Sequence, residues 1–269
     1  MKISKFWLWL SLIAGILMAG VSFLGISSES TYSKETFNWA AQAMGQDYVN
    51  LFIAFPALII SAYLAGKGSL RAYLIWLGVL FYVIYSYTLY AFFIHFGSNF
   101  LTYVAILGLA FYSLAGSLMD LEWRELLPIF SNVKSKLTGI LLIIIGTIFY
   151  LLWLSDVIGA LSSGTVPQGI ADIGSFVNPV HVLDMAFFLP GAFLIAYLMK
   201  KRRVAGFLFA VPLMVFFAIM GLAILAIFIS LSQEGIPSPL IQEIFMATIV
   251  LANLMSIHKF FKGMSEPAK

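Results

Sequence analysis

His181 and Asp184 are the two side chains of this sequence best suited to chemistry inside an apolar helix. They lie three residues apart, which places both on one helical face. Asn178 and Pro179 precede them with residue types that begin helices, and an apolar run then continues to Met199. Because an ionisable residue within such a run is costly, the pair is a functional hypothesis: it could bind a hydrogen-bonding solute or transfer a proton.

Two cofactor alternatives use the same residues. His95, His181 and Asp184 could supply nitrogen and oxygen ligands to a metal ion, but one H-x-x-D pattern without a second pair is a weak metal signature. His95 and His181 could also be the axial ligands of a haem. A bound retinal is disfavoured because no lysine falls inside a predicted span. We therefore predict no cofactor and keep metal and haem as alternatives.

Most other polar residues near the spans fall on the same side of the membrane as His181. They include Asp47 and Asn50 on the second predicted span, and Tyr90 in a hydroxyl-rich stretch of the third. We expect a polar pocket that opens to the outside, with Asp184 paired to His181 itself, to Tyr90 or to His95. The candidate ligand-binding residues are His181, Asp184, Asn178, His95, Tyr90, Asp47 and Asn50.

The composition defines the setting of these residues. The chain has 269 residues, of which 62% are hydrophobic and 10% charged, with a mean hydropathy of +1.00. These values are typical of an all-α, multi-pass membrane protein. The absence of cysteine excludes disulfides and thiolate metal sites. Eight spans are predicted at residues 6–25, 48–65, 72–95, 100–118, 137–155, 179–199, 204–230 and 240–258.

Basic residues predict the orientation. With the N-terminus in the cytoplasm, 14 of the 15 Lys and Arg residues lie in cytoplasmic segments, and only Lys34 lies outside. The 14 are Lys2, Lys5, Lys67, Arg71, Arg124, Lys134, Lys136, Lys200, Lys201, Arg202, Arg203, Lys259, Lys262 and Lys269. We therefore predict a cell-membrane protein with both termini cytoplasmic. Because these cations lie at helix ends, they indicate topology rather than a nucleic-acid partner.

Two features organise the spans further. Residues 33–45 have a capping residue, Ser33, and an apolar period of 3.6, which predicts a surface helix lying flat on the interface. A shift of 134 positions aligns Pro56 with Pro190 and Lys67 with Lys201. This alignment predicts a parallel internal duplication, with one four-helix half at 1–134 and the other at 135–269, forming one membrane domain.

The segment NPVHVLD, together with Pro190 and the paired aromatic spans, resembles an uncharacterised family of prokaryotic polytopic membrane proteins. This resemblance implies a shared fold and carries no activity. From the residues, we expect binding or transport of a small solute. A membrane-embedded enzyme acting on a lipid-like or quinone-like substrate at the outer leaflet, with His181 and Asp184 as acid and base, is an alternative. A non-catalytic sensor or assembly factor is a third class, and the sequence makes no prediction about oligomeric state.

Overall fold

The structure is a computed structural model that describes residues 4–236 and 240–265. Throughout this described part the chain is helical and contains no strand. The elements are α1 (Lys5–Ser27), α2 (Phe37–Val49), η1 (Asn50–Ala54), α3 (Phe55–Gly66), α4 (Leu70–Phe93), α5 (Phe100–Met119), η2 (Trp123–Phe130), α6 (Ser135–Ser163), α7 (Gln168–Ile173), α8 (Pro179–Leu183), η3 (Asp184–Phe188), α9 (Leu189–Lys200), α10 (Val204–Gln233) and α11 (Leu240–Lys262).

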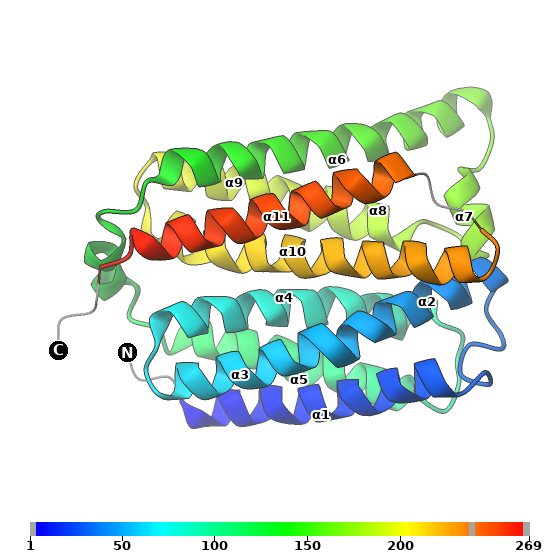
Figure 1. Cartoon of the computed structure of the whole chain (residues 1–269), viewed down its shortest axis with the longest axis horizontal. Helices are drawn as coiled ribbons and strands as arrows, with labels where there is room; N and C mark the ends of the chain where they lie inside the picture. The colour runs from blue at the N-terminus through cyan, green and yellow to red at the C-terminus, as the bar shows by residue number, and fades with distance from the viewer. Residues whose placement is uncertain (1–3, 237–239, 266–269) are drawn as a thin grey trace.

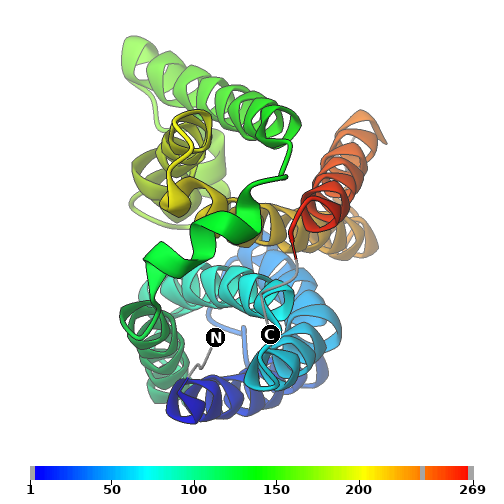
Figure 2. The same ribbon diagram turned by 90° about the vertical axis from the view of Figure 1, so that its left-hand side faces the viewer.

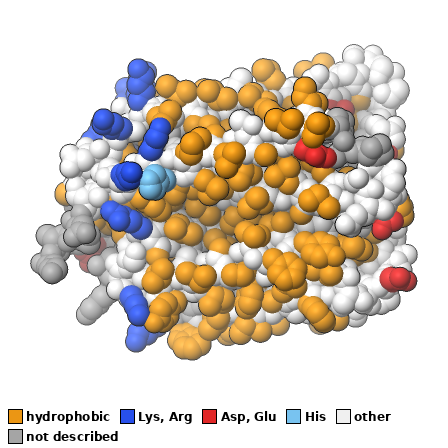
Figure 3. Space-filling view, in the orientation of Figure 1, with side chains coloured by type: hydrophobic (Ala, Val, Ile, Leu, Met, Phe, Trp, Pro, Cys, Tyr) orange, Lys and Arg blue, Asp and Glu red, His pale blue; other side chains and the backbone are white. Residues whose placement is uncertain are grey.

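Eight helical stretches in the described residues are long and apolar enough to cross a membrane. Six are the helices α1, α4, α5, α6, α10 and α11, and the other two are the continuous stretches Phe37–Gly66 and Pro179–Lys200. Their outer surface carries exposed large apolar side chains, which cover the middle of the molecule in Figure 3. Because such a band would be unfavourable in water, these eight helices identify a multi-pass membrane protein.

The two ends of the bundle differ in charge. The helix α1 begins and α11 ends at the same end, which we call the proximal end (Figure 1). Lys and Arg side chains gather there, whereas most of the acidic side chains visible on this face lie toward the opposite, distal end (Figure 3). The proximal connections contain Lys67, Lys134 and Lys201. Of the basic residues used to predict orientation, Lys2 and Lys269 lie outside the described residues.

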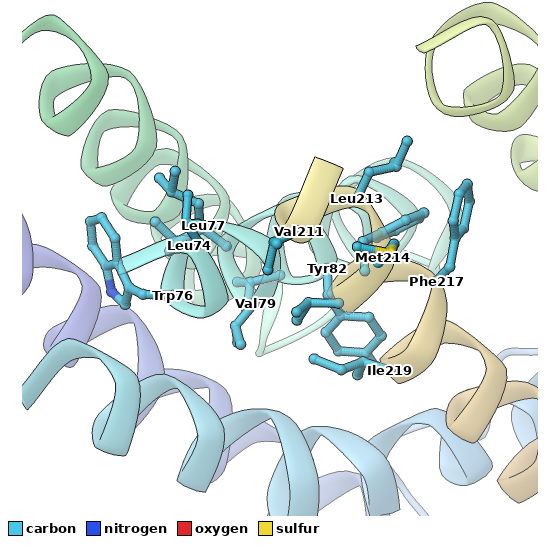
Figure 4. Packing of buried hydrophobic residues seen from close by; sticks show 14 of the residues in the cluster. Leu74, Trp76, Leu77, Val79, Tyr82, Val211, Leu213, Met214, Phe217 and Ile219 are labelled. Atoms are coloured by element: carbon cyan, nitrogen blue, oxygen red, sulfur yellow. The ribbon is translucent and has the colours of Figure 1, made fainter. Parts of the chain in front are cut away.

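Viewed along the helices, α1, α3, α4 and α5 form one group, and α6, α9, α10 and α11 form another (Figure 2). The helices α4 and α10 pack against each other between the two groups, with Leu77 and Val211 among the buried side chains drawn in Figure 4. Gly78 makes this approach close, since a Cβ atom there would lie 2.7 Å from the Pro212 carbonyl oxygen. The centre of the protein is therefore a tight contact between two helices.

The second span begins earlier than predicted. Residues 37–66 form one helical stretch in which α2, η1 and α3 follow without a break, so the predicted flat surface helix is wrong. The cap is Thr36 rather than Ser33, with its hydroxyl accepting a hydrogen bond from the Trp39 backbone N–H. Gly45 allows α2 to lie against α10, because a Cβ atom at this position would be 2.6 Å from the Cα atom of Ile227. The packing against α10 explains why this less hydrophobic segment enters the bundle.

Two spans are interrupted by short π-helical segments. The segment η1 begins at Asn50, and η3 begins at Asp184. π-Helical segments inside α-helices are rare and frequently mark functional sites. Both segments thus begin at a residue that the sequence singles out as a candidate ligand-binding residue.

Candidate functional site

The Asp184 carboxylate is held by two helices other than its own. Its Oδ1 atom accepts a hydrogen bond from the Tyr85 hydroxyl of α4 at 3.1 Å, and its Oδ2 atom accepts one from the indole N–H of Trp153 in α6 at 2.9 Å. The partners named from the sequence were His181, Tyr90 and His95, and neither of the two donors found, Tyr85 and Trp153, is among them. Asp184 nevertheless faces protein groups, as a polar residue within a span requires.

His181 is connected to Asp184 through Trp153. The imidazole and indole rings lie with their centroids 4.4 Å apart, while the indole N–H points to Asp184. On its other side, Nε2 of His181 is 3.9 Å from Oδ2 of Asp156. The His181 side chain is 6% exposed, whereas that of Asp156 is 45% exposed. Asp156, His181, Trp153 and Asp184 therefore form a connected series of contacts with its exposed end at Asp156. We call these four residues, together with Tyr85, the Asp184 cluster.

Asp47 belongs to a second, separate cluster. Its Oδ2 atom accepts a hydrogen bond from the Tyr32 hydroxyl, and its Oδ1 atom accepts from Tyr90 at 3.0 Å and from the Asn50 amide at 3.3 Å. Tyr82 donates to the Asn50 carbonyl oxygen at 2.9 Å. We call these five residues the Asp47 cluster. All five are buried, and Asp47 itself is 1% exposed.

The helix α4 separates the two clusters. Tyr82 and Tyr90 contribute to the Asp47 cluster, whereas Tyr85 contributes to the Asp184 cluster. The tyrosine hydroxyls of the third span therefore contact two different clusters from two faces of the same helix. The seven candidate residues accordingly do not form a single pocket.

The remaining candidates have structural contacts. The Asn178 side-chain oxygen caps α8 by accepting from the backbone N–H groups of Val180 and His181. His95 is exposed, and its Nδ1 atom lies 2.9 Å from Oε2 of Glu35. This pair joins the distal connection before α2 to the connection after α4. Its contact with Glu35 leaves His95 outside both clusters.

The geometry gives little support to a metal site. Within residues 4–236 and 240–265, no group of three or more His, Cys, Asp or Glu side chains is placed to share a metal ion. His95 is engaged by Glu35, and the ring of His181 packs on Trp153. The metal and haem alternatives therefore gain no observation in their favour.

Comparison with known protein families, characterised proteins and solved structures finds no match to this chain. The contacts within the two clusters are therefore the basis for assigning a function.

An apolar pocket of about 320 Å³ lies between α6 and α9. It is lined by Thr147, Tyr150, Leu151, Pro190 and Phe193. Its nearest lining residues are Leu151, two residues before Trp153 in α6, and Pro190, six residues after Asp184. It is thus adjacent in sequence to the Asp184 cluster, but its lining differs from the polar pocket expected from the sequence.

Sequence reasoning missed Trp153 and Tyr32 as site residues. A tryptophan within an apolar span and a tyrosine in a connection both look like ordinary interfacial aromatics. Burial of the Tyr32 hydroxyl beside Asp47 raises the pKa of Tyr32 well above its usual value. The only sequence signal for Trp153 is that a buried indole N–H needs an acceptor.

Proposed function

We propose that the protein binds a small solute at the Asp184 cluster and carries it across the membrane. The observation that supports this most directly is the position of Asp184. Its carboxylate lies within a span and is held by neutral donors from α4 and α6. It has no ion pair with a Lys or Arg side chain in the described residues. A carboxylate in this setting can be neutralised by a solute that carries positive charge.

The chemistry of the cluster indicates the class of solute. Asp184 and Asp156 supply carboxylate acceptors, whereas the donors that reach Asp184, the Tyr85 hydroxyl and the Trp153 indole N–H, are neutral. The exposed cations gather at the proximal end (Figure 3). We therefore propose a small organic cation or another solute rich in hydrogen-bond donors, rather than a phosphate or a carboxylate.

A binding assay tests this proposal. The protein in lipid nanodiscs is titrated with a series of monovalent organic amines and, for comparison, with organic anions of similar size. We expect binding of at least one amine that is lost in Asp184→Asn. The control is Glu29→Gln, which removes an exposed carboxylate outside both clusters. Equal binding of amines and anions, or binding unchanged in Asp184→Asn, contradicts the proposal.

The runner-up function is an enzyme that acts on a lipid-like substrate at the outer leaflet. The apolar pocket between α6 and α9 favours it, because an alkyl chain could occupy this pocket while a head group contacts His181 and Asp184. Incubating the protein with labelled lipids and analysing the products by mass spectrometry tests this reading. A product that is absent with His181→Ala would favour the enzyme over the transporter.

We infer that the distal end faces outside and that both termini are cytoplasmic. The gathering of Lys and Arg at the proximal end supports this orientation, because cytoplasmic segments carry an excess of these residues. The Asp184 cluster would then be reached from outside through Asp156.

We also infer that residues 1–134 and 135–269 arose by duplication. Several local features recur at a spacing of 134. The segments η1 and η3 begin at Asn50 and Asp184. A residue with positive φ follows each of the spans that contain them, with values of 90° at Gly68 and 54° at Arg202. A recurrence of backbone geometry at a fixed spacing is less expected by chance than a match between apolar residues of two hydrophobic helices.

The contact between the central helices supports the same inference. Gly78 and Pro212 are 134 positions apart, and they meet where α4 crosses α10. Equivalent positions touch each other only at the axis that relates two repeats. The similarity between the two halves is incomplete. The helix α2 has 13 residues, whereas α8 has five. As a result, α2 packs far more extensively on α10 than α8 does on α4.

A further inference from the structure

We infer that Asp47 is a reversible proton-binding site, with the Tyr90 hydroxyl as the group that adjusts to its two states. This inference deepens the proposed function, on which it rests for its role: the proton bound at Asp47 would accompany solute movement. The geometry of the Asp47 cluster carries the argument, and the helix α4 links it to Asp184.

The Tyr90 hydroxyl has one proton and two acceptors. Its oxygen is 3.0 Å from Oδ1 of Asp47 and 3.1 Å from the backbone carbonyl oxygen of Ala43. Both distances are normal for a hydrogen bond, so the proton can point to either oxygen. A rotation about the C–O bond of Tyr90 exchanges the two without moving the backbone.

In the ionised state, the carboxylate accepts three hydrogen bonds. Tyr32 donates to Oδ2, and Tyr90 and Asn50 donate to Oδ1. Tyr82 donates to the Asn50 carbonyl oxygen and so directs the Asn50 amide N–H toward Asp47. Donors of this kind stabilise a carboxylate in the absence of a cation.

In the protonated state, the new proton is on Oδ1 of Asp47. It is donated to the Tyr90 oxygen, while the Tyr90 hydroxyl turns to donate to the Ala43 carbonyl. Oδ2 continues to accept from Tyr32. One proton has been added and one hydroxyl has rotated, and each of these groups retains a partner. The cluster therefore accommodates both states, which a purely structural hydrogen-bond network does not require.

Among the residues that the structure describes, none places a fixed charge against Asp47 that would favour one state permanently. The titratable groups that face Asp47 are neutral phenols: Tyr32 from the distal connection, Tyr82, Tyr87 and Tyr90 from α4, and Tyr103 from α5. No Lys, Arg or His of the described residues forms an ion pair with Asp47. Uncompensated charge buried in a bilayer is costly, so a proton is a suitable neutralising partner.

The cluster is closed toward α1 and connected toward the distal end. A Cβ atom built on Gly25 of α1 would lie 1.9 Å from Oδ2 of Asp47, so this helix covers the carboxylate directly. Tyr32, which contacts the same oxygen, belongs to the distal connection between α1 and α2. A proton would therefore enter from the distal side through Tyr32. The rings of Tyr87 and Tyr103, with centroids 5.3 Å from that of Tyr90, cover the cluster from α4 and α5.

Infrared spectroscopy of the whole protein, reconstituted in phosphatidylcholine vesicles without solute, tests the inference. A protonated carboxyl has a C=O stretching band separate from the amide bands, and the band shifts slightly in D₂O. We expect one such band to appear and disappear reversibly across a pH series in the natural protein, and to be lost in Asp47→Asn. Asp184→Asn, which disables the proposed solute site, should retain it.

Tyr90→Phe provides a second readout that does not require removal of Asp47. Without the Tyr90 oxygen, the protonated carboxyl loses its acceptor, so its band should move to higher frequency while remaining sensitive to pH. An Asp47 band that is present at every pH, or at none, overturns the inference, as does an unchanged spectrum in Asp47→Asn. If Asp47→Asn fails to fold, an unshifted band in Tyr90→Phe overturns it instead. Because no solute is present, failure here is distinguishable from failure of the solute-binding proposal.

Discussion

Substituting Gly25 with alanine should destabilise the protein, although it adds only one methyl group. The added Cβ atom would lie 1.9 Å from Oδ2 of Asp47 and 2.9 Å from the Tyr32 hydroxyl, where ordinary contacts are 3.4–4 Å. Overpacking of this kind costs about 1–3 kcal/mol. Displacing the carboxylate also weakens its hydrogen bond with Tyr32, which contributes about 0.5–1.5 kcal/mol. The higher helix propensity of alanine offsets about 1 kcal/mol of this cost, so we expect the free energy of unfolding to fall by about 0.5–3.5 kcal/mol.

The matched control is Gly20→Ala in the same helix. A Cβ atom at Gly20 meets nothing within 4 Å, and alanine favours a helix over glycine by about 1 kcal/mol. Unfolding by titration with sodium dodecyl sulfate in mixed micelles, followed by circular dichroism, measures both variants. If Gly25→Ala proves as stable as Gly20→Ala, then α1 does not cover Asp47 and the closed geometry of the cluster is wrong.

Three further predictions follow from single contacts. Asp184→Ala should lower the free energy of unfolding by about 2–4 kcal/mol, because two partly buried hydrogen bonds lose their acceptor at about 1–2 kcal/mol each. Asp184→Asn should cost less than about 1 kcal/mol, and equal losses for the two variants in a denaturation assay would show that the charge itself is required for folding. Cysteine introduced at Ser30 should react with an impermeant maleimide applied to whole cells, and cysteine at Gly68 should react only after lysis; the reverse pattern would invert the orientation. Gly78→Ala should destabilise the protein by about 1–3 kcal/mol relative to Gly108→Ala, where a Cβ atom meets nothing within 4 Å, and equal thermal stability of the two would argue against a close crossing of α4 and α10.

The helices could be predicted from the sequence because hydropathy over about 20 residues reflects the thickness of the bilayer. The third span, expected at 72–95, is found at Leu70–Phe93. The largest difference is the start of the second span, expected at 48 and found at Phe37, and the fifth span, expected to end at 155, continues to Ser163. Residues 37–47 contain Asn38, Gln42 and Asp47, which lower their hydropathy. They enter the bundle because of packing on α10 and hydrogen bonds within it, and neither is encoded in a hydropathy window.

The sequence singled out several of the residues that form the two clusters, but it did not predict how they are grouped, and whether they bind a ligand stays a prediction. His181, Asp184, Asp47 and Asn50 are all within the two clusters, as their position in apolar helices suggested. The grouping could not be foreseen, because Tyr85 and Tyr90 lie on one helix at a spacing that fits one broad face or two. Only the packing of α2 and α8 near different sides of α4 decides between them.

The glycine that the proposed duplication would pair with Gly25 shows a difference between the surroundings of α1 and α6. Gly159 of α6 is 134 positions after Gly25, yet a Cβ atom there would meet nothing within 4 Å. The helix α1 therefore closes over its carboxylate, whereas α6 leaves the corresponding position open. This asymmetry fits a sealed proton site at Asp47 and a solute site at Asp184 that is reached from the distal end.

Gly159→Ala should accordingly leave the free energy of unfolding within about 1 kcal/mol of that of the natural protein, in contrast to Gly25→Ala. The same denaturation assay in mixed micelles compares the two variants. A loss of stability in Gly159→Ala as large as in Gly25→Ala would mean that α6 packs as closely over its half as α1 does. The two halves would then be equally closed, and the assignment of solute to one and proton to the other would lose its structural basis.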